Sequence, residues 1–290
     1  MNDHCDGLHE KKRVALLSVI AAVFLTASKL VIGTLTGSLG ILSEALHSGL
    51  DLVAAAITYF CVHVSDKPAD TEHHYGHGKI ENLSALLETL LLFITCIWVI
   101  YEALRRLATG HSAIEVNVWS YLVVIASILV DLGRSRSLMR AAKKYNSPAL
   151  EADALHFSTD IWSSAVVLFG LVIAGFGWHA ADSVAALVVA AIVIYVSCRL
   201  GKKSIDALLD KAPKHVADIV AGIAAQAPNV SSYHDIKVRN AGADVFVDIV
   251  VHFEPLLTIE QTHAVSDEIE RMIRAAVPRS TVFVHQEPEQ

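Results

Sequence analysis

The strongest constraint on how this chain can fold is its set of long apolar segments. A helix needs about 20 mostly apolar residues to cross a bilayer. Six segments approach this length, and they cover roughly residues 14–35, 39–62, 80–108, 117–138, 149–175 and 180–200. Lipid offers no hydrogen bonds to the backbone, so segments of this kind favour helices. The sequence therefore predicts an all-α membrane bundle of six helices.

Composition divides the chain into two parts. Charged residues make up 18% of the sequence, against about 25% in typical soluble domains. We predict a six-helix transmembrane domain over 1–208, with a short polar N-terminal tail over 1–12, and a cytoplasmic domain over 209–290. No cleavable signal peptide is expected, because the chain starts with polar residues and its first apolar run is too long for one.

The cytoplasmic part has the pattern of a small α+β domain. Val247, Ile249, Val251 and Phe253 fall on one face of an alternating run, as in a half-buried strand. The expected elements are a helix at 213–227, strands at 233–239 and 243–254 around a turn at 240–242, a helix at 259–276 and a strand at 281–285. The order αββαβ predicts a small sheet with its helices on one face.

Basic residues predict the orientation in the membrane, because Lys and Arg accumulate on the cytoplasmic side of membrane helices. Most of them fall on one predicted side, namely Lys11, Lys12, Arg13, Lys67, Lys79, Arg134, Arg136, Arg140, Lys143, Lys144, Arg199, Lys202 and Lys203. Arg105 and Arg106 fall on the other side. We expect a multi-pass protein of the cell (inner) membrane with both termini in the cytoplasm.

Two His-x-x-x-Asp motifs lie inside apolar segments, at His47 and Asp51 and at His156 and Asp160. An ionisable side chain at the bilayer centre costs about 2.5–3.5 kcal/mol on insertion scales, which marks it as functional. The four-residue spacing places each pair on one helix face. Two facing pairs would offer two imidazoles and two carboxylates, a tetrahedral set that suits Zn²⁺. For any single residue, hydrogen bonding between helices is the alternative role.

Glu44 and Asp153 each precede a motif histidine by three residues, roughly on the same helix faces. Carboxylates in such places often orient metal-binding imidazoles. Residues that line the mouth of a site or stabilise the bundle would occupy the same positions. The sequence leaves both roles open.

A polar stretch rich in histidine connects the second and third apolar segments. It contains Asp70, His73, His74 and His77, whose side chains include typical metal ligands. Polar loops often carry histidine without binding metal. However, glycines on both sides of His77 indicate a defined backbone shape. We therefore expect a candidate second metal site in this loop.

The cytoplasmic part carries a third group of candidate ligands. They are His234, His252, His263 and His285, followed by Gln286 and Glu287. Each histidine lies on a different predicted element. One exposed histidine is usually a solvated surface residue, but four with carboxylates nearby favour metal binding.

Several classes of function are disfavoured. The net charge of −7 gives no basic surface for nucleic acid. The four cysteines are scattered without a Cys-x-x-Cys pair, which argues against disulfides and thiolate metal sites. A membrane metalloenzyme would need a motif such as His-Glu-x-x-His, and the sequence has none. Four strong ligands at mid-membrane favour a carrier over a channel, because they bind tightly and release slowly. A metal-sensing membrane scaffold without transport is the remaining alternative.

The chain resembles the cation diffusion facilitators over nearly its full length. The matching stretches are residues 37–51 (GSLGILSEALHSGLD), 74–79 (HYGHGK), 151–160 (EADALHFSTD) and 284–287 (VHQE). The resemblance implies a homodimeric secondary transporter, not an enzyme, that exports divalent metal from the cytoplasm in exchange for protons. It implies Zn²⁺ as cargo and as a structural or regulatory ion, with no organic cofactor. Fe²⁺, Cd²⁺, Co²⁺, Ni²⁺ and Mn²⁺ are the alternative cargoes.

The resemblance also implies roles for individual residues. The transport site would comprise His47, Asp51, His156 and Asp160. The loop site would comprise Asp70, His73 and His77, with His74 as a neighbour. The cytoplasmic site, which would sense metal load, would comprise His234, His252, His263 and His285, with Gln286 as a weaker ligand and Glu287 where relatives carry Asp. Lys79 and Asp210 match a charge interlock at the dimer interface.

Overall fold

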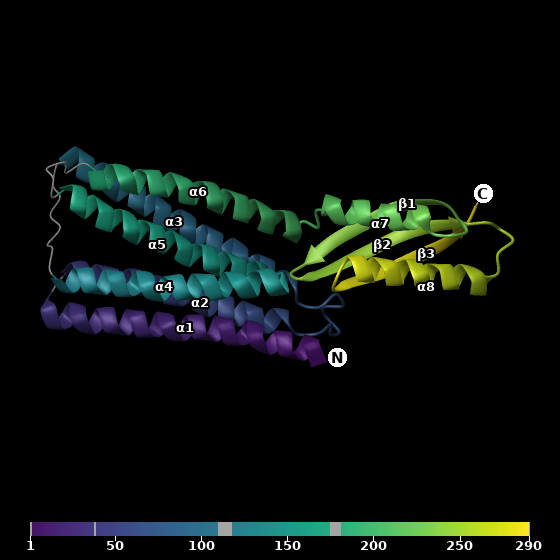
Figure 1. Ribbon diagram of the computed structural model, residues 1–290, viewed down its shortest axis with the longest axis horizontal. Helices are drawn as coiled ribbons and strands as arrows, with labels where there is room; N and C mark the ends of the chain where they lie inside the picture. The colour runs from purple at the N-terminus through teal and green to yellow at the C-terminus, as the bar shows by residue number, and fades with distance from the viewer. Residues whose placement is uncertain (1, 38, 110–117, 175–180, 290) are drawn as a thin grey trace.

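Long helices form one region of the molecule and a small sheet with two helices forms the other (Figure 1). The computed structural model describes residues 2–37, 39–109, 118–174 and 181–289. The long helices are α1 (Asn2–Thr36), α2 (Leu39–Ser65), α3 (Lys79–Thr109), α4 (Val118–Tyr145), α5 (Pro148–Ala174) and α6 (Ala181–Leu208). The N-terminus lies at the end of the bundle that faces the sheet.

These helices match the predicted apolar segments but extend beyond several of them. One such extension is in α4, which continues past the expected end at residue 138 to Tyr145. Its added turns are rich in Arg, Lys and Ala, which are good helix formers outside the apolar core of a membrane. Ser147 then caps α5, with its Oγ accepting from the Leu150 N–H at 3.4 Å, and Pro148 occupies the first helical position.

The helical region has the exterior of a membrane domain. Phe24, Leu35, Phe60 and Ile97 are large apolar side chains that face outward and are exposed. Within the described residues, three helices are long and apolar enough to cross a membrane, over His9–Leu35, Glu44–Ser65 and Lys79–Arg105. A helical transmembrane domain is therefore confirmed, while the number of six spans stays a prediction.

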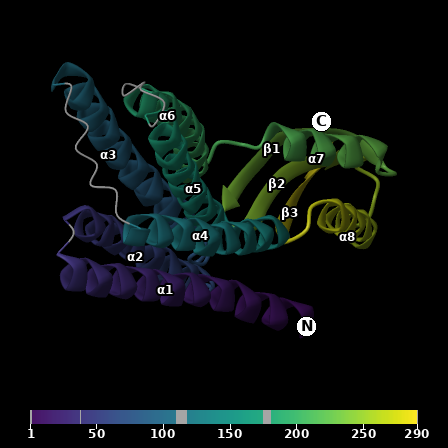
Figure 2. The same cartoon turned by 60° about the vertical axis from the view of Figure 1, so that its left-hand side comes forward.

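The helices diverge towards the end of the bundle that lies away from the sheet. Figure 2 shows α3 and α6 separating there from α1, α2 and α4. At the opposite end, buried charges join the helices. Lys11 of α1 donates to Asp66 at 2.7 Å and to Glu81 of α3 at 2.6 Å, and its side chain is only 2% exposed. The bundle is thus closed by ion pairs at the end near the sheet.

The C-terminal region confirms the predicted order αββαβ. Its elements are α7 (Lys214–Gln226), β1 (Val230–Ala241), β2 (Asp244–Phe253), α8 (Ile259–Ala276) and β3 (Ser280–Pro288). The sheet has the order β1-β2-β3, with β1 antiparallel and β3 parallel to the central strand. Val247, Ile249, Val251 and Phe253 pack on one face against both helices, as their alternation predicted.

The turn between β1 and β2 differs from the prediction. We expected it at residues 240–242, but β1 continues to Ala241 and the chain turns at Gly242 and Ala243. Gly242 has a φ of 62°, which favours glycine, and its N–H donates to Asn82 of α3 at 2.9 Å. This hairpin therefore contacts α3 through its turn.

Candidate metal sites

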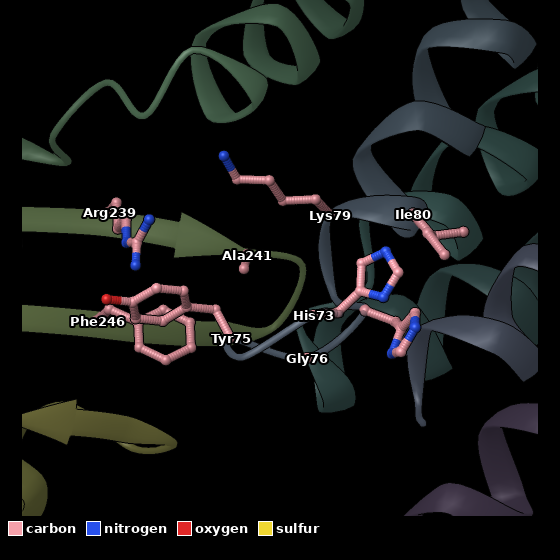
Figure 3. Close-up of a pocket in the computed structure, with 9 residues that line it drawn as sticks. His73, Tyr75, Gly76, Lys79, Ile80, Arg239, Ala241 and Phe246 are labelled. Carbon is pink, nitrogen blue, oxygen red and sulfur yellow. The ribbon is translucent and has the colours of Figure 1, made fainter. Parts of the chain in front are cut away.

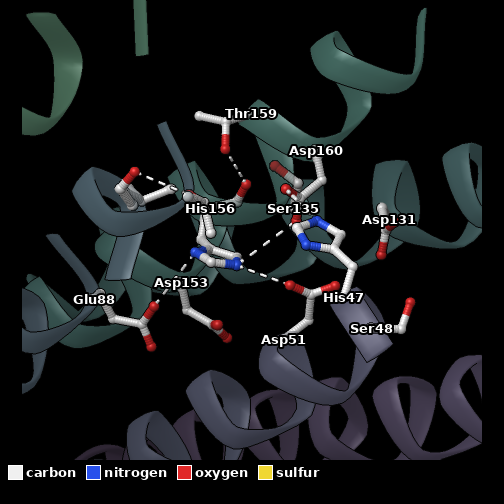
Figure 4. A network of polar contacts seen from close by, with 12 residues as sticks. His47, Ser48, Asp51, Glu88, Asp131, Ser135, Asp153, His156, Thr159 and Asp160 are labelled. Carbon is white, nitrogen blue, oxygen red and sulfur yellow. Dashed lines mark hydrogen bonds and ion pairs between the residues drawn. The ribbon is translucent and has the colours of Figure 1, made fainter. Parts of the chain in front are cut away.

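The two His-x-x-x-Asp motifs meet inside the bundle, between α2 and α5 (Figure 4). His47 Nε2 lies 3.6 Å from Asp160 Oδ1. His156 Nε2 lies 3.2 Å from Asp51 Oδ1 and 3.7 Å from Asp160 Oδ2. The structure thus brings together all four residues that the sequence singled out.

Local geometry explains this pairing. Each motif places His and Asp one turn apart on a single helix face. The histidine of each helix therefore meets the aspartate of the other. The packing of α2 against α5 thus brings the four side chains of the two motifs into one cluster.

The donor set fits a divalent cation. One donor atom each from His47, Asp51 and Asp160 lies within 4.8 Å of the others. His156 is 3% exposed, and the buried Asp160 Oδ2 has no hydrogen-bond partner within the described residues. Two imidazoles and two carboxylates suit a four-coordinate ion such as Zn²⁺. We call these four residues the transport cluster, after the role that the resemblance implies for them.

Glu88 of α3 adjoins the transport cluster, and sequence reasoning missed it. Its carboxylate is fully buried, with Oε2 3.8 Å from His156 Nδ1. Thr58 Oγ1 donates to its other oxygen, Oε1, at 2.8 Å. The available signal was a carboxylate about nine residues into an apolar segment, where an ionisable group marks function.

Glu44 and Asp153 have other partners. Glu44 Oε2 lies 3.3 Å from Lys29 Nζ. Asp153 is fully buried and accepts from Ser18 Oγ at 3.3 Å. Of the two roles that the sequence left open for them, these contacts favour stabilisation of the bundle.

The loop after α2 gathers a second cluster, made of Asp70, His73 and His77. Asp70 Oδ1 accepts from the backbone N–H groups of His73 at 2.7 Å and Glu72 at 2.9 Å. These backbone hydrogen bonds hold the pKa of Asp70 below its usual range. Asp70 Oδ2 lies 3.5 Å from His77 Nε2, and Oδ1 lies 3.3 Å from His73 Nδ1. The donors fit a cation, while the neighbouring His74 is exposed and outside this cluster.

The same loop is docked onto the sheet (Figure 3). The Tyr75 ring meets Phe246 edge-on, with centroids 5.2 Å apart, and Arg239 Cζ lies 3.8 Å from the Tyr75 centroid. A Cβ on Gly78 would lie 2.2 Å from the carbonyl oxygen of Ala241. The backbones of loop and hairpin therefore touch, and only glycine fits at residue 78.

Lys79 and Asp210 form an ion pair of 2.9 Å within this chain. Lys79 begins α3 and Asp210 follows α6, with a φ of 56°. Both side chains are more than a third exposed. The contact joins the two helices next to the sheet; its place in a dimer interface stays a prediction.

A third cluster lies on the sheet face that α7 and α8 leave open. His252 Nε2 lies 3.0 Å from His234 Nδ1 and 3.8 Å from Glu287 Oε2. One donor atom from each of these three residues lies within 4.8 Å of the others. His285 Nε2 lies 3.5 Å from Glu287 Oε1, on the rim of the cluster. Nitrogen and carboxylate donors at this spacing fit Zn²⁺, and Glu287 reaches the histidines.

Gln286 and His263 do not join this cluster within one chain. Strand residues alternate between faces, so Gln286 points to the helices, where Thr262 Oγ1 donates to its Oε1 at 2.8 Å. His263 lies on α8 with Nδ1 3.7 Å from Asp267. Their predicted ligand roles therefore have no support from contacts inside this chain.

Comparison with known proteins agrees with the fold. The model described as "Cation efflux transmembrane domain" matches residues 15–209, and "Cation efflux protein, cytoplasmic domain" matches residues 212–289. The cation-efflux pump FieF of Yersinia enterocolitica is 29% identical over 96% of this chain and 92% of its own. The cation-efflux pump FieF of Citrobacter koseri is 30% identical over 95% of this chain and 92% of its own length. A solved structure of a MamM CTD variant in its nickel form is 19% identical, with a TM-score of 0.26, over 27% of this chain and all of that one.

The helical bundle and the α+β domain, together with the two family matches, define a multi-pass membrane protein that transports cations. The chain belongs to the cation efflux family, the cation diffusion facilitators. Proteins of this family transport divalent metal cations, so the chain is a transporter and not a classical enzyme.

Proposed function

We propose that this protein exports a divalent metal ion, with Zn²⁺ as its main cargo, in exchange for protons. The observation that carries the proposal is the transport cluster, in which His47, Asp51, His156 and Asp160 converge between two helices. Imidazole and carboxylate ligands suit Zn²⁺ without thiolates. The same donors can also bind Fe²⁺, Cd²⁺, Co²⁺, Ni²⁺ and Mn²⁺. The affinity of one site differs between these metals, so the donor set alone does not exclude them.

Proton exchange follows from the chemistry of these ligands. Imidazole and carboxylate must be deprotonated to bind metal, so metal binding releases protons. The cluster faces the cytoplasm, binds metal and loses protons, then opens to the other side, releases metal and takes up protons. An inward proton gradient then drives metal out of the cell.

The topology we propose has α1 to α6 crossing the inner membrane, with both termini in the cytoplasm. Each of these helices has at least 27 residues, more than the roughly 20 that a bilayer requires. We place the transmembrane domain at 1–208 and the cytoplasmic domain at 209–290. Basic residues near the sheet end of the bundle support this orientation.

The cytoplasmic clusters serve regulation in this proposal. A homodimer joins two copies through their cytoplasmic domains, next to the ion pair of Lys79 and Asp210. The sheet cluster of His234, His252 and Glu287 binds metal when its cytoplasmic level rises. Metal binding then draws the two domains together, with His285, His263 and Gln286 as further ligands.

Proteoliposomes test the central proposal. Asp51→Ala and Asp160→Ala each remove one carboxylate from the transport cluster and should abolish Zn²⁺ transport and the proton flux coupled to it. A panel of divalent metals on the unaltered protein ranks the cargoes. Metal-dependent proton flux that persists in both variants would contradict the assignment of the site.

A further inference from the structure

Glu88 is a buried carboxylate beside the transport cluster that the metal ligands do not account for. Its Oε2 and His156 Nδ1 face each other across 3.8 Å. Neither atom has a hydrogen-bond partner within the described residues. Burying a polar atom without a partner is costly, and an ionisable group inside a membrane domain is functional by default. We therefore look for a function in which Glu88 Oε2 and His156 Nδ1 act together.

The two ring nitrogens of His156 face different groups (Figure 4). Nε2 points to Asp51 and Asp160, at 3.2 and 3.7 Å, whereas Nδ1 points to Glu88. A neutral imidazole that gives one nitrogen to a metal carries its proton on the other. With Nε2 turned to the metal, the N–H of Nδ1 is directed at a carboxylate acceptor.

Glu88 is itself held in place by the helix that carries half of the transport cluster. Thr58 of α2 donates to Glu88 Oε1 at 2.8 Å, and both residues are fully buried. That hydrogen bond leaves Oε2 free to face His156 on α5. The carboxylate, carried by α3, thus contacts both α2 and α5.

We propose that Glu88 is a positioning residue of the transport site. Its carboxylate accepts a hydrogen bond from the Nδ1–H group of His156, which fixes the tautomer and the orientation of the ring so that Nε2 is presented to the cargo metal. Partners of this kind typically change metal affinity by about 10–100-fold when they are removed. This inference rests on the proposed transport function and adds a residue to that site.

The test compares two substitutions of Glu88 in proteoliposomes loaded with Zn²⁺. Glu88→Leu removes the acceptor and should raise the KM for Zn²⁺ about 10–100-fold, with a smaller change in kcat. Glu88→Gln keeps the shape and an acceptor oxygen, so its KM should stay within roughly threefold of the wild type, because a neutral acceptor still orients the imidazole.

Thr58→Val is a second test of the inference, and Thr89→Val is its matched control. Thr58→Val removes the donor that holds Glu88 and should raise the KM less than Glu88→Leu does. Thr89→Val changes a threonine that is equally buried, next to Glu88 on α3, but bonded to Ala85 of its own helix at 2.8 Å. It should leave the KM unchanged. If Glu88→Leu fails to fold, Glu88→Gln and Thr58→Val decide the question.

A spectroscopic signature separates positioning from packing. Nitrogen NMR of ¹⁵N-labelled imidazole in the Zn²⁺-loaded protein should show His156 with its proton on Nδ1, and this signal should be lost or exchange-broadened in Glu88→Leu. If Glu88→Leu keeps the wild-type KM and tautomer while Asp51→Ala is inactive, the inference is wrong and the transport site stands. If both variants transport normally, the transport site itself is wrong. A Glu88→Gln variant as impaired as Glu88→Leu would overturn the hydrogen-bond role.

Discussion

The transport cluster and the loop cluster use the same kinds of donor in opposite surroundings. In the bundle, the His156 side chain is 4% exposed and the Asp160 side chain 18%. In the loop, the side chains of His73 and Asp70 are 53% and 50% exposed. Helices fix the first group, whereas backbone hydrogen bonds to Asp70 shape the second. This contrast in exposure underlies the different roles, transport and regulation, that we propose for the two clusters.

The difference matters because water screens charge. Between buried groups, attraction and repulsion are several times stronger than at a surface. A divalent ion and protons therefore compete more strongly for the ligands of the transport cluster than for those of the loop cluster. In the proposed function, the loop and sheet clusters would exchange metal directly with the cytoplasm, as a sensor requires.

The largest expected effect separates these two clusters. Asp160→Asn keeps the shape of the side chain but removes a buried anionic ligand, and we expect Zn²⁺ transport to fall at least about 100-fold. Asp70→Asn makes the same change in the exposed loop and should lower transport by less than about 10-fold. Initial rates in proteoliposomes measure both. If both variants lose the same share of their Zn²⁺ transport rate, the assignment of one cluster to transport and the other to regulation is wrong.

A second prediction concerns how the loop is fixed to the sheet. Gly78→Ala drives a Cβ into the Ala241 carbonyl, and it should destabilise the protein by roughly 1–3 kcal/mol. Gly222→Ala on α7 is the matched control, because its Cβ would meet nothing within 4 Å. Thermal unfolding of the full chain in detergent compares the two. An unchanged melting temperature for Gly78→Ala would show that loop and hairpin do not touch.

A third prediction sharpens the boundaries of the sheet cluster. His252 contacts both His234 and Glu287, so His252→Ala should weaken Zn²⁺ binding there about tenfold or more, or about 1.4 kcal/mol. His263→Ala, on the far side of the sheet, should have the smaller effect. Calorimetric titration measures affinity, and distances between labelled domains of the dimer report compaction. If His263→Ala is the more damaging, its ligand role is supplied across the dimer.

The smallest effect is expected at the aromatic contact. Tyr75→Ala removes the ring that packs against both Arg239 and Phe246, for a loss of about 1 kcal/mol. Tyr75→Phe keeps the ring and should unfold like the wild type. Hydrogen exchange of the loop backbone checks both variants. Faster exchange in Tyr75→Phe would point to the hydroxyl group instead of the ring.

Periodicity explains how much of the fold could be predicted. Apolar segments of bilayer length predicted the long helices, and the alternation from Val247 to Phe253 predicted a strand buried on one face. The i,i+4 spacing of His and Asp predicted that the members of each motif share a helix face. The turn was predicted too early in the chain, and the N–H of its Gly242 donates to Asn82 of α3, a contact between residues distant in the sequence that no local pattern reports.

By itself the sequence determined the helices and strands and the helix face that each His-x-x-x-Asp motif shares, because both depend on neighbours along the chain. Only the tertiary structure decided what each group faces. It turned Glu88 towards His156, Glu44 towards Lys29 and Gln286 away from the sheet cluster. Such contacts join residues that are distant in sequence, and they depend on how helices and strands pack, which no local pattern encodes.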